Sequence, residues 1–255
     1  MKIITYNVNG LRAVIQKGFV EWLKATEADV ICLQETKAYS SQIPLVLFED
    51  LGYQTYFQSA EKKGYSGVAI FTKNTPQKIT KGYDLPSEIE DNEGRIIRAD
   101  FENLSILSVY MPSGSSGEDR RDFKMRWNHN FHQYIQALKK EIPNLLIVGD
   151  YNICHRDIDI HNPKANVKTS GFLPEEREWL DSFFESGFVD TFRHLNKEPH
   201  HYTWWSSWGT AREKNLGWRI DYQAISSHLA DKVKRAIILT EAKFSDHCPV
   251  LIEIE

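Results

Sequence analysis

The sequence predicts an α/β (α+β) fold in which two packed mixed β-sheets are flanked by helices. Strand-like segments, most of them rich in β-branched or aromatic residues, outnumber helical ones. Many strand candidates that are neighbours in the sequence look antiparallel, which argues against a doubly wound parallel sheet. No linker, low-complexity tract or charge block interrupts the chain. We therefore expect residues 1–255 to form a single domain.

The strand candidates are short apolar runs with polar or glycine-containing segments between them. In chain order they are Lys2–Tyr6, Val30–Leu33, Tyr53–Phe57, Gly67–Phe71, Ile96–Phe101, Leu104–Val109, Leu145–Val148, Tyr202–Trp205, Asp221–Ile225 and Val250–Ile254. The fifth and sixth are joined by Glu102-Asn103, which indicates a hairpin.

Three segments have helical patterns: Phe19–Thr26, Arg120–Lys139 and Pro174–Ser186. The third begins with a proline followed by acidic residues, which suit the first turn of a helix and the positive end of its dipole. The basic residues of the second, Arg120, Arg121, Lys124 and Arg126, form a cluster, and we expect at least two of them to lie on a solvated face.

Composition excludes few classes of function. The net charge of −4 and the pI near 6.2 do not indicate a nucleic-acid binder, but total charge leaves room for a local basic face. Cys32, Cys154 and Cys248 lack C-x-x-C spacing, so we expect free thiols in a reducing compartment. Since no leader pattern or membrane-length apolar run is present, we expect a cytoplasmic protein without membrane contact.

Four separated polar clusters carry most of the functional information: TYNVNGLR, LQETK, VGDYN and SDHCP. Each follows a short apolar run, so we expect buried strands to bring these residues to one rim of a sheet: Asn7, Glu35, Asp150, Asn152, Asp246 and His247. Such groups are costly to bury unless they pair or hold a cation. Hard oxygen ligands favour Mg²⁺ or Mn²⁺ over zinc. The clusters therefore predict a metal-dependent site that hydrolyses phosphate esters.

Individually, these residues have structural alternatives. Glu35 is the best candidate metal ligand, but it could instead form a salt bridge with Lys37. Asp150 and Asn152 are two apart on an extended segment and face the same way, so one could accept a proton from water while the other donates to a phosphate oxygen. The alternative for this pair, and for Asn7, is an Asx turn that closes a strand.

The SDHCP cluster is more specific. Asp246 and His247 are adjacent, so on an extended strand they point to opposite sides, and Asp246 is free to coordinate metal. His247 then needs a carboxylate from elsewhere, and GWRIDY supplies Asp221. A carboxylate on one imidazole nitrogen fixes the tautomer and leaves the other nitrogen aimed at substrate.

The chain resembles the exonuclease III family of AP endonucleases, within the endonuclease/exonuclease/phosphatase superfamily. The resemblance rests on YNVNGLRA, LQETK, GYSGVAIFTK, EGRIIRADF, VYMPSG, GDYNICHRDIDIHNPK, SGFLPEER, GWRIDY and SDHCPV, which run in family order from the first strand to the last. It implies a four-layer α/β sandwich. Because no long extension of the vertebrate kind precedes the first motif, the chain is similar to the compact bacterial form.

The resemblance also implies roles for these residues. Glu35 would be the principal metal ligand, with Asn7, Asp246, Asp150 and Asn152 close to the metal. The catalytic set would have Asp150 activating water, Asn152 steadying the transition state, and His247 (held by Asp221) and Tyr110 contacting the scissile phosphate. DNA contacts would come from Arg12, Lys37, Tyr65, Arg95, Asn166 and Thr169. The pocket for an extruded abasic sugar would be lined by Phe172, Trp208, Leu216 and Trp218.

The function implied is Mg²⁺-dependent hydrolysis, with Mn²⁺ as a substitute, of the phosphodiester 5′ to an abasic site in duplex DNA. An abasic nucleotide is inexpensive to flip because it has no base to unstack. Ser113 and Thr169 stand where some relatives carry asparagine, so the balance with 3′-exonuclease and 3′-phosphatase activity stays open. The protein is expected to be a monomer that binds DNA with abasic sites or blocked 3′ ends. The alternatives are a phosphodiesterase for non-DNA substrates and a catalytically weak nucleic-acid-binding member of the fold.

Overall fold

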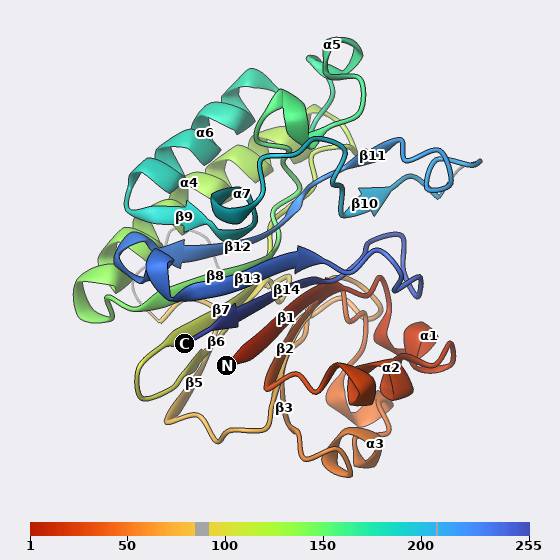
Figure 1. Cartoon of the computed structure of the whole chain (residues 1–255), viewed down its shortest axis with the longest axis vertical. Coiled ribbons are helices and arrows are strands. Elements are labelled where there is room, and N and C mark those ends of the chain that lie inside the picture. The colour runs from red at the N-terminus through yellow and green to blue at the C-terminus, as the bar shows by residue number, and fades with distance from the viewer. Residues whose placement is uncertain (85–91, 208) are drawn as a thin grey trace.

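Two mixed sheets lie face to face in the computed structural model, which describes residues 1–84, 92–207 and 209–255 (Figure 1). Within these residues each sheet has six strands. The first has the order β13 (Val233–Ile238), β14 (Val250–Ile254), β1 (Lys2–Asn7), β2 (Val30–Gln34), β4 (Val68–Thr72) and β3 (Gln54–Gln58). The second has the order β5 (Lys78–Lys81), β6 (Ile96–Asp100), β7 (Ser105–Tyr110), β8 (Leu145–Asp150), β12 (Asp221–Ser226) and β9 (Phe188–Asp190). A separate two-stranded sheet pairs β10 (Trp204–Trp205) with β11 (Gly217–Trp218).

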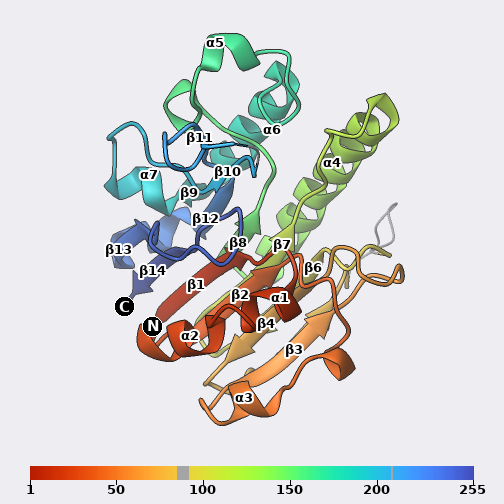
Figure 2. The ribbon, with the colours of Figure 1, turned by 90° about the vertical axis from the view of Figure 1, so that its right-hand side faces the viewer.

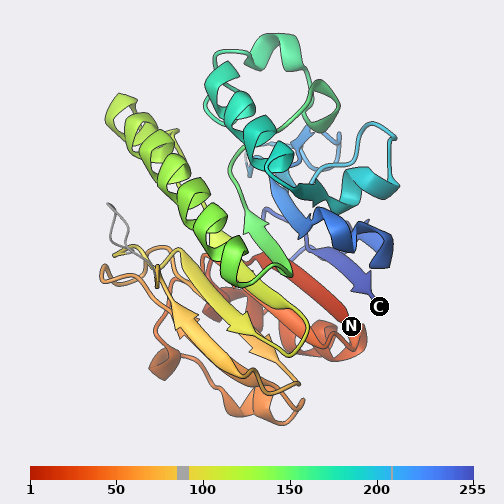
Figure 3. The ribbon, with the colours of Figure 1, turned by 90° about the vertical axis from the view of Figure 1, so that its left-hand side faces the viewer.

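Helices cover the outer face of each sheet, as the opposite views in Figures 2 and 3 show. The first sheet is covered by α1 (Leu11–Ile15), α2 (Phe19–Thr26) and α3 (Val46–Glu49). The second is covered by α4 (Glu118–Glu141) and α6 (Pro174–Glu185), which pack together. The remaining helices are α5 (Pro163–Asn166) and α7 (Thr191–Leu195). The four layers confirm the predicted sandwich.

The central strands are buried on both faces, which is why they are continuous apolar runs in the sequence. Along β2, Ile31 and Leu33 pack against the first helical layer, while Val30 and Cys32 face the space between the sheets. Along β8, Ile147 belongs to the core under α4 and α6, and its neighbours along the strand face the other sheet. The two-residue period of a strand therefore builds three apolar cores.

Strand direction brings the polar clusters together. β1 and β2 are parallel, as are β7 and β8, so each pair ends at the same edge of its sheet. β12 and β14 are antiparallel to β8 and β1, so they begin where those strands end. The clusters meet at the end of both sheets that faces away from the chain termini (Figure 1). The expectation of one rim of one sheet is therefore corrected, because the residues come from both sheets.

Most predicted elements are confirmed to within one or two residues, including the β6–β7 hairpin. The Tyr202–Trp205 strand is shorter than expected, because only Trp204 and Trp205 pair with β11. The strands β5, β9 and β11 (Gly217–Trp218) and the short helices were not predicted. Of β13, only the end was expected, as the apolar run Ile237–Leu239 ahead of the SDHCP cluster. The SDHCP cluster does not end a strand but precedes β14.

Two expectations from composition can also be compared with the structure. Cys32, Cys154 and Cys248 are buried free thiols, as expected. Among the helices of the described segments, none combines the length and apolar character needed to cross a bilayer.

Candidate active site

A cavity of ≈ 320 Å³ opens at the end of the two sheets where the polar clusters meet. Its wall combines carboxylates, an imidazole, small hydroxyl side chains and two indoles. The lining residues are Glu35, Tyr110, Ser113, Ser115, Asp150, Asn152, Thr169, Ser170, Gly171, Trp204, Trp218, Ile220, Asp246 and His247.

The backbone is strained where it delivers these side chains. Glu35 directly follows β2 and has a φ of 50°, and Asn152, just after β8, has a φ of 54°. Left-handed conformations of residues other than glycine cost about 1–3 kcal/mol and cluster at functional sites. Gly149 is required for another reason, since a Cβ there would lie 1.8 Å from the carbonyl oxygen of Val109 on the adjacent strand.

An amide joins the two central carboxylates. Asn7 Nδ2 donates to Glu35 Oε1 and to Asp150 Oδ2, at 2.9 Å in both cases. The side-chain oxygen of Asn7, Oδ1, accepts the backbone N–H of Asn9 at 3.0 Å, so Asn7 turns its amide NH₂, and not its oxygen, toward the acids. Ligand atoms of Glu35, Asp150 and His247 lie within 4.8 Å of one another. Two closely spaced carboxylates fit a hard divalent cation.

The structure also contains the alternative partner of Glu35. Lys37 Nζ lies 2.9 Å from Glu35 Oε2, and the two side chains are 32% and 16% exposed. Both expectations for Glu35 are therefore compatible with its position: it lines the cavity beside Asp150, and it forms an ion pair with Lys37 at the rim.

His247 is held by a carboxylate of the other sheet. Its Nδ1 lies 2.9 Å from Asp221 Oδ2, and its Nε2 lies 3.8 Å from Asp150 Oδ2. Burial lowers the pKa of His247, but Asp221 and Asp150 outweigh burial and raise it to about 10. His247 therefore lines the cavity as an imidazolium held between two carboxylates. Burial and Asp221 raise the pKa of Asp150.

Asp246 points away from this group. Its Oδ1 accepts from Asn9 Nδ2 at 3.0 Å and its Oδ2 from Trp204 Nε1 at 3.1 Å. It lines the same cavity but is not part of the closest group of ligand atoms. Asp246 and His247 have different hydrogen-bond partners, but they precede β14 and line the same cavity, so they do not lie on opposite sides of a strand as the sequence predicted.

Asn152 combines the turn and the site. Its backbone N–H donates to Asp150 Oδ1 at 2.8 Å, which is the expected Asx turn, and its Nδ2 donates to the Met111 carbonyl at 2.9 Å. On α4, the buried ammonium of Lys124 donates to the backbone carbonyl of Asn152 at 2.9 Å and to Glu176 Oε1 at 2.5 Å. Lys124 therefore holds the turn that carries Asn152. Arg121 and Arg126 of the same helix are exposed, which agrees with the expectation that at least two residues of the basic cluster lie on a solvated face.

Tyr110 is fixed from behind by Arg95. The Arg95 guanidinium lies 4.6 Å from the Tyr110 ring centroid and donates to the Tyr110 carbonyl at 2.8 Å. Burial and the neighbouring Glu35 raise the pKa of Tyr110, so its hydroxyl keeps its proton. Arg95 is 1% exposed and also binds Glu93, so it faces inward and not toward solvent as the DNA-contact expectation implied.

Of the other expected DNA contacts, only Thr169 lines the cavity. Arg12 is exposed on α1. Asn166 donates to the Asn162 carbonyl at 3.0 Å and shapes the same loop as Thr169. The Tyr65 hydroxyl, which is half-buried, accepts from Arg120 Nη2 at 2.9 Å.

The expected sugar pocket is only partly as anticipated. Trp218 lines the cavity, and its ring meets that of Trp204 edge-on at 6.0 Å and 88°. Phe172 is 1% exposed and packs behind this wall, whereas Leu216 is 38% exposed and is not among the lining residues. Trp208 lies outside the described residues. Trp204 and Ile220 also belong to the wall. The concentration of tryptophans between residues 204 and 218 was the sequence signal for Trp204, whereas Ile220 was not predicted.

Paired acids, a carboxylate-held imidazole and a buried tyrosine at the end of a two-sheet sandwich define the class of the protein as a hydrolase with a candidate metal site. A family model described as the Endonuclease/Exonuclease/phosphatase family matches residues 4–247. An exodeoxyribonuclease of Bacillus subtilis is 43% identical over 252 residues, which are 98% of each chain. The chain belongs to the Endonuclease/Exonuclease/phosphatase family, and the resemblance to its exonuclease III members is confirmed.

Solved structures agree with this assignment. An AP endonuclease from Archaeoglobus fulgidus has a TM-score of 0.90 and 29% identity, with coverage of 100% of this chain and 99% of that chain. A 3′ phosphatase from Neisseria, solved with a product DNA hairpin, has a TM-score of 0.89 and 26% identity, with the same coverage.

Proposed function

We propose that this protein is a DNA repair nuclease that hydrolyses the phosphodiester 5′ to an abasic site in duplex DNA, with accompanying 3′-exonuclease and 3′-phosphatase activity. The observation that carries the proposal is one cavity in which the Glu35 and Asp150 carboxylates, the Asp221-held imidazole and the indoles of Trp204 and Trp218 converge. Relatives described as an exodeoxyribonuclease, an AP endonuclease and a 3′ phosphatase support it.

The proposed cofactor is Mg²⁺, with Mn²⁺ as a substitute. Glu35 and Asp150 would hold it, and Asp246 and Asn152 would lie nearby, because all four line the same cavity. Asn7 would position the two acids through its amino group. When bound, the ion would supply charge neutralisation at the phosphate.

The residues of the chain account for the remaining chemistry. Asp150 would orient the attacking water and accept its proton. The protonated His247 would donate to a non-bridging oxygen of the scissile phosphate and stabilise charge that develops there. Tyr110, whose hydroxyl keeps its proton, would donate to the same phosphate or to the leaving oxygen. Asn152 would steady the transition state from the turn that follows β8.

Substrate choice would come from the indole wall. A deoxyribose without a base could lie against Trp218 and Trp204. The same cavity of ≈ 320 Å³ must also hold the phosphate, so it would leave too little room for the base of an intact nucleotide. Arg12, Lys37 and Thr169 would contact the DNA backbone at the rim. Arg95 and Tyr65 would act by holding Tyr110 and the rim in place.

We further propose that residues 1–255 act as a single catalytic domain, as a monomer in the cytoplasm.

A substrate panel tests the function: duplex DNA with one abasic site, the same duplex undamaged, a 3′-phosphate end, a 3′-recessed end and a small non-DNA phosphodiester. We expect incision 5′ to the abasic site to be the fastest cleavage of an internal bond. Hydrolysis of the small phosphodiester alone would instead favour a phosphodiesterase for non-DNA substrates, and binding of abasic DNA without cleavage would favour a binding protein.

A further inference from the structure

A single guanidinium is held by three carbonyl groups behind the active-site cavity. Arg212, on the connection between β10 and β11, donates from Nη1 to the Ser245 carbonyl at 2.9 Å. Its Nη2 donates to the carbonyls of Thr240 and Ala242, at 3.1 and 2.9 Å. All three acceptors belong to the segment between β13 and β14, which also contains Asp246 and His247.

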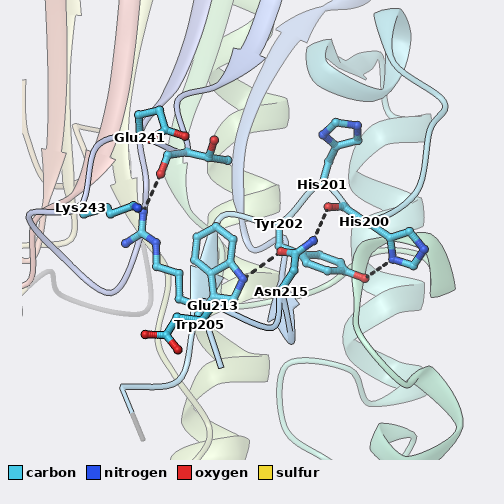
Figure 4. Close-up of a pocket in the computed structure, with 10 residues that line it drawn as sticks. His200, His201, Tyr202, Trp205, Glu213, Asn215, Glu241 and Lys243 are labelled. Carbon is cyan, nitrogen blue, oxygen red and sulfur yellow. Dashed lines mark hydrogen bonds between the residues drawn. The ribbon is translucent and has the colours of Figure 1, made fainter. Parts of the chain in front are cut away.

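Arg212 is also fixed on its own side. Its guanidinium lies 4.7 Å from the ring centroid of Trp205, which is 4% exposed. The indole N–H of Trp205 donates to Asn215 Oδ1 at 3.1 Å, and Asn215 donates to the His200 carbonyl (Figure 4). The backbone N–H of Trp205 donates to the Asp246 carbonyl at 3.1 Å. Two loops that are far apart in sequence are thus joined beside Asp246.

The segment between β13 and β14 packs through Phe244 against the rings of Phe19 and Trp22. A cavity of ≈ 550 Å³ also borders it, lined by Glu213, Glu241 and Lys243 among other residues (Figure 4). Near this cavity the side chain of Arg212 holds the carbonyls of Thr240, Ala242 and Ser245, and the backbone N–H of Cys248 adds a hydrogen bond to the Thr203 carbonyl at 2.7 Å. Lys17 holds the same segment from another direction, through the Phe244 carbonyl at 2.9 Å.

We propose that Arg212 is a positioning residue for the nuclease reaction, which fixes Asp246 and His247 by tying their segment to the β10–β11 connection. The inference rests on the proposed function and extends it to a residue that does not line the cavity. Only arginine offers a planar fork of five donors that can reach three carbonyl groups at once, whereas lysine offers a compact ammonium. A displacement of about 1 Å in a catalytic group costs about 10²-fold in rate, so loss of the link is expected to affect turnover.

The test compares Arg212→Ala and Arg212→Lys with Lys214→Ala, an exposed cation on the same connection. Melting curves first establish an assay temperature at which all variants are folded. Single-turnover incision and DNA affinity are then measured on a duplex with one abasic site. We expect Arg212→Ala to slow incision by about 10- to 100-fold, with an affinity no weaker than that of Lys214→Ala, and Arg212→Lys to be intermediate.

A second readout does not depend on activity. The Nδ1 proton of His247, which faces Asp221 Oδ2, is followed by NMR. We expect its signal to broaden or shift in Arg212→Ala but not in Lys214→Ala. Equal incision rates and an equal His247 signal in these two variants would overturn the positioning role. A wild-type protein that fails to incise abasic DNA would overturn the proposed function, while the NMR comparison would still test the link.

Discussion

Asp221 and His247 come from different sheets, yet His247 Nδ1 and Asp221 Oδ2 are 2.9 Å apart. Asp221 opens β12 of the second sheet, and His247 lies just before β14 of the first. This contact therefore joins the two sheets and, in the proposed function, also orients the imidazole. It keeps the imidazole protonated and aims its other nitrogen at the cavity.

Asp221→Asn removes the negative charge but keeps the shape of the side chain. It is expected to lower the pKa of His247 and to allow the wrong tautomer, which slows single-turnover incision by about 10²- to 10⁴-fold. DNA affinity should stay near the wild-type value, because Asp221 is 2% exposed and cannot contact the duplex. Quench-flow rates and a binding titration check this. An unchanged rate would show that Asp221 is only structural.

Trp218→Ala tests where substrate discrimination resides, with Leu216→Ala as the matched control. Removal of the indole should lower the ratio of incision rates on abasic and undamaged duplexes, because a larger cavity admits an intact nucleotide. Truncation of a packed tryptophan costs up to about 3–5 kcal/mol, so melting must precede the assay. Leu216 is 38% exposed, so Leu216→Ala should change neither the ratio of incision rates nor the melting temperature. If the two variants gave the same ratio, discrimination would lie elsewhere.

Lys124→Met tests the support below Asn152. Glu176 is 1% exposed, so the variant leaves a buried carboxylate without its cation and should lose about 3–5 kcal/mol of unfolding free energy. Adding Glu176→Gln should recover part of the loss, because the amide oxygen can still accept the Gly171 N–H. Urea unfolding measures the effect, and Arg121→Met, on the exposed face of the same helix, should change it little. A loss no larger than that of Arg121→Met would contradict this role.

Stability in acid should depend on Asp159. Burial raises its pKa, but Arg219 and Arg193 outweigh burial and lower it from 3.8 to about 2. Because the folded-state pKa is the lower one, the stabilisation is complete above pH 3.8 and is lost as pH falls toward 2. The contribution is on the order of 2 kcal/mol. Unfolding free energies at pH 5 and below should therefore fall less steeply in Asp159→Asn than in the wild type, and parallel curves would refute the assignment.

The sequence predicted the sandwich and its acid cluster because buried strands and strand-end acids leave local signals. β2 and β8 are apolar on both faces, and Glu35 and Asp150 stand at their ends. The beginning of β13 was harder to predict, because it is an edge strand whose exposed Lys234 breaks the apolar pattern.

Side-chain direction at the site was less predictable. Nothing in the sequence distinguishes an arginine that faces DNA from one that packs against a tyrosine ring. Arg95 packs against Tyr110, because Glu93 and the Tyr110 carbonyl accept hydrogen bonds from its guanidinium. In the same way, Lys124 is buried because Glu176, distant in sequence, supplies its counter-charge. Both outcomes depend on tertiary partners.

The central claim is that the cavity containing Glu35 and Asp150 is a metal-dependent phosphodiesterase centre for abasic DNA. The most direct measurement is single-turnover incision of a duplex with one abasic site, using protein dialysed against EDTA and then titrated with Mg²⁺. We predict no product in EDTA, full recovery with Mg²⁺, and in Glu35→Ala a rate that is lower by orders of magnitude with a higher Mg²⁺ requirement. Incision by the wild-type protein that persists undiminished in excess EDTA would contradict the claim.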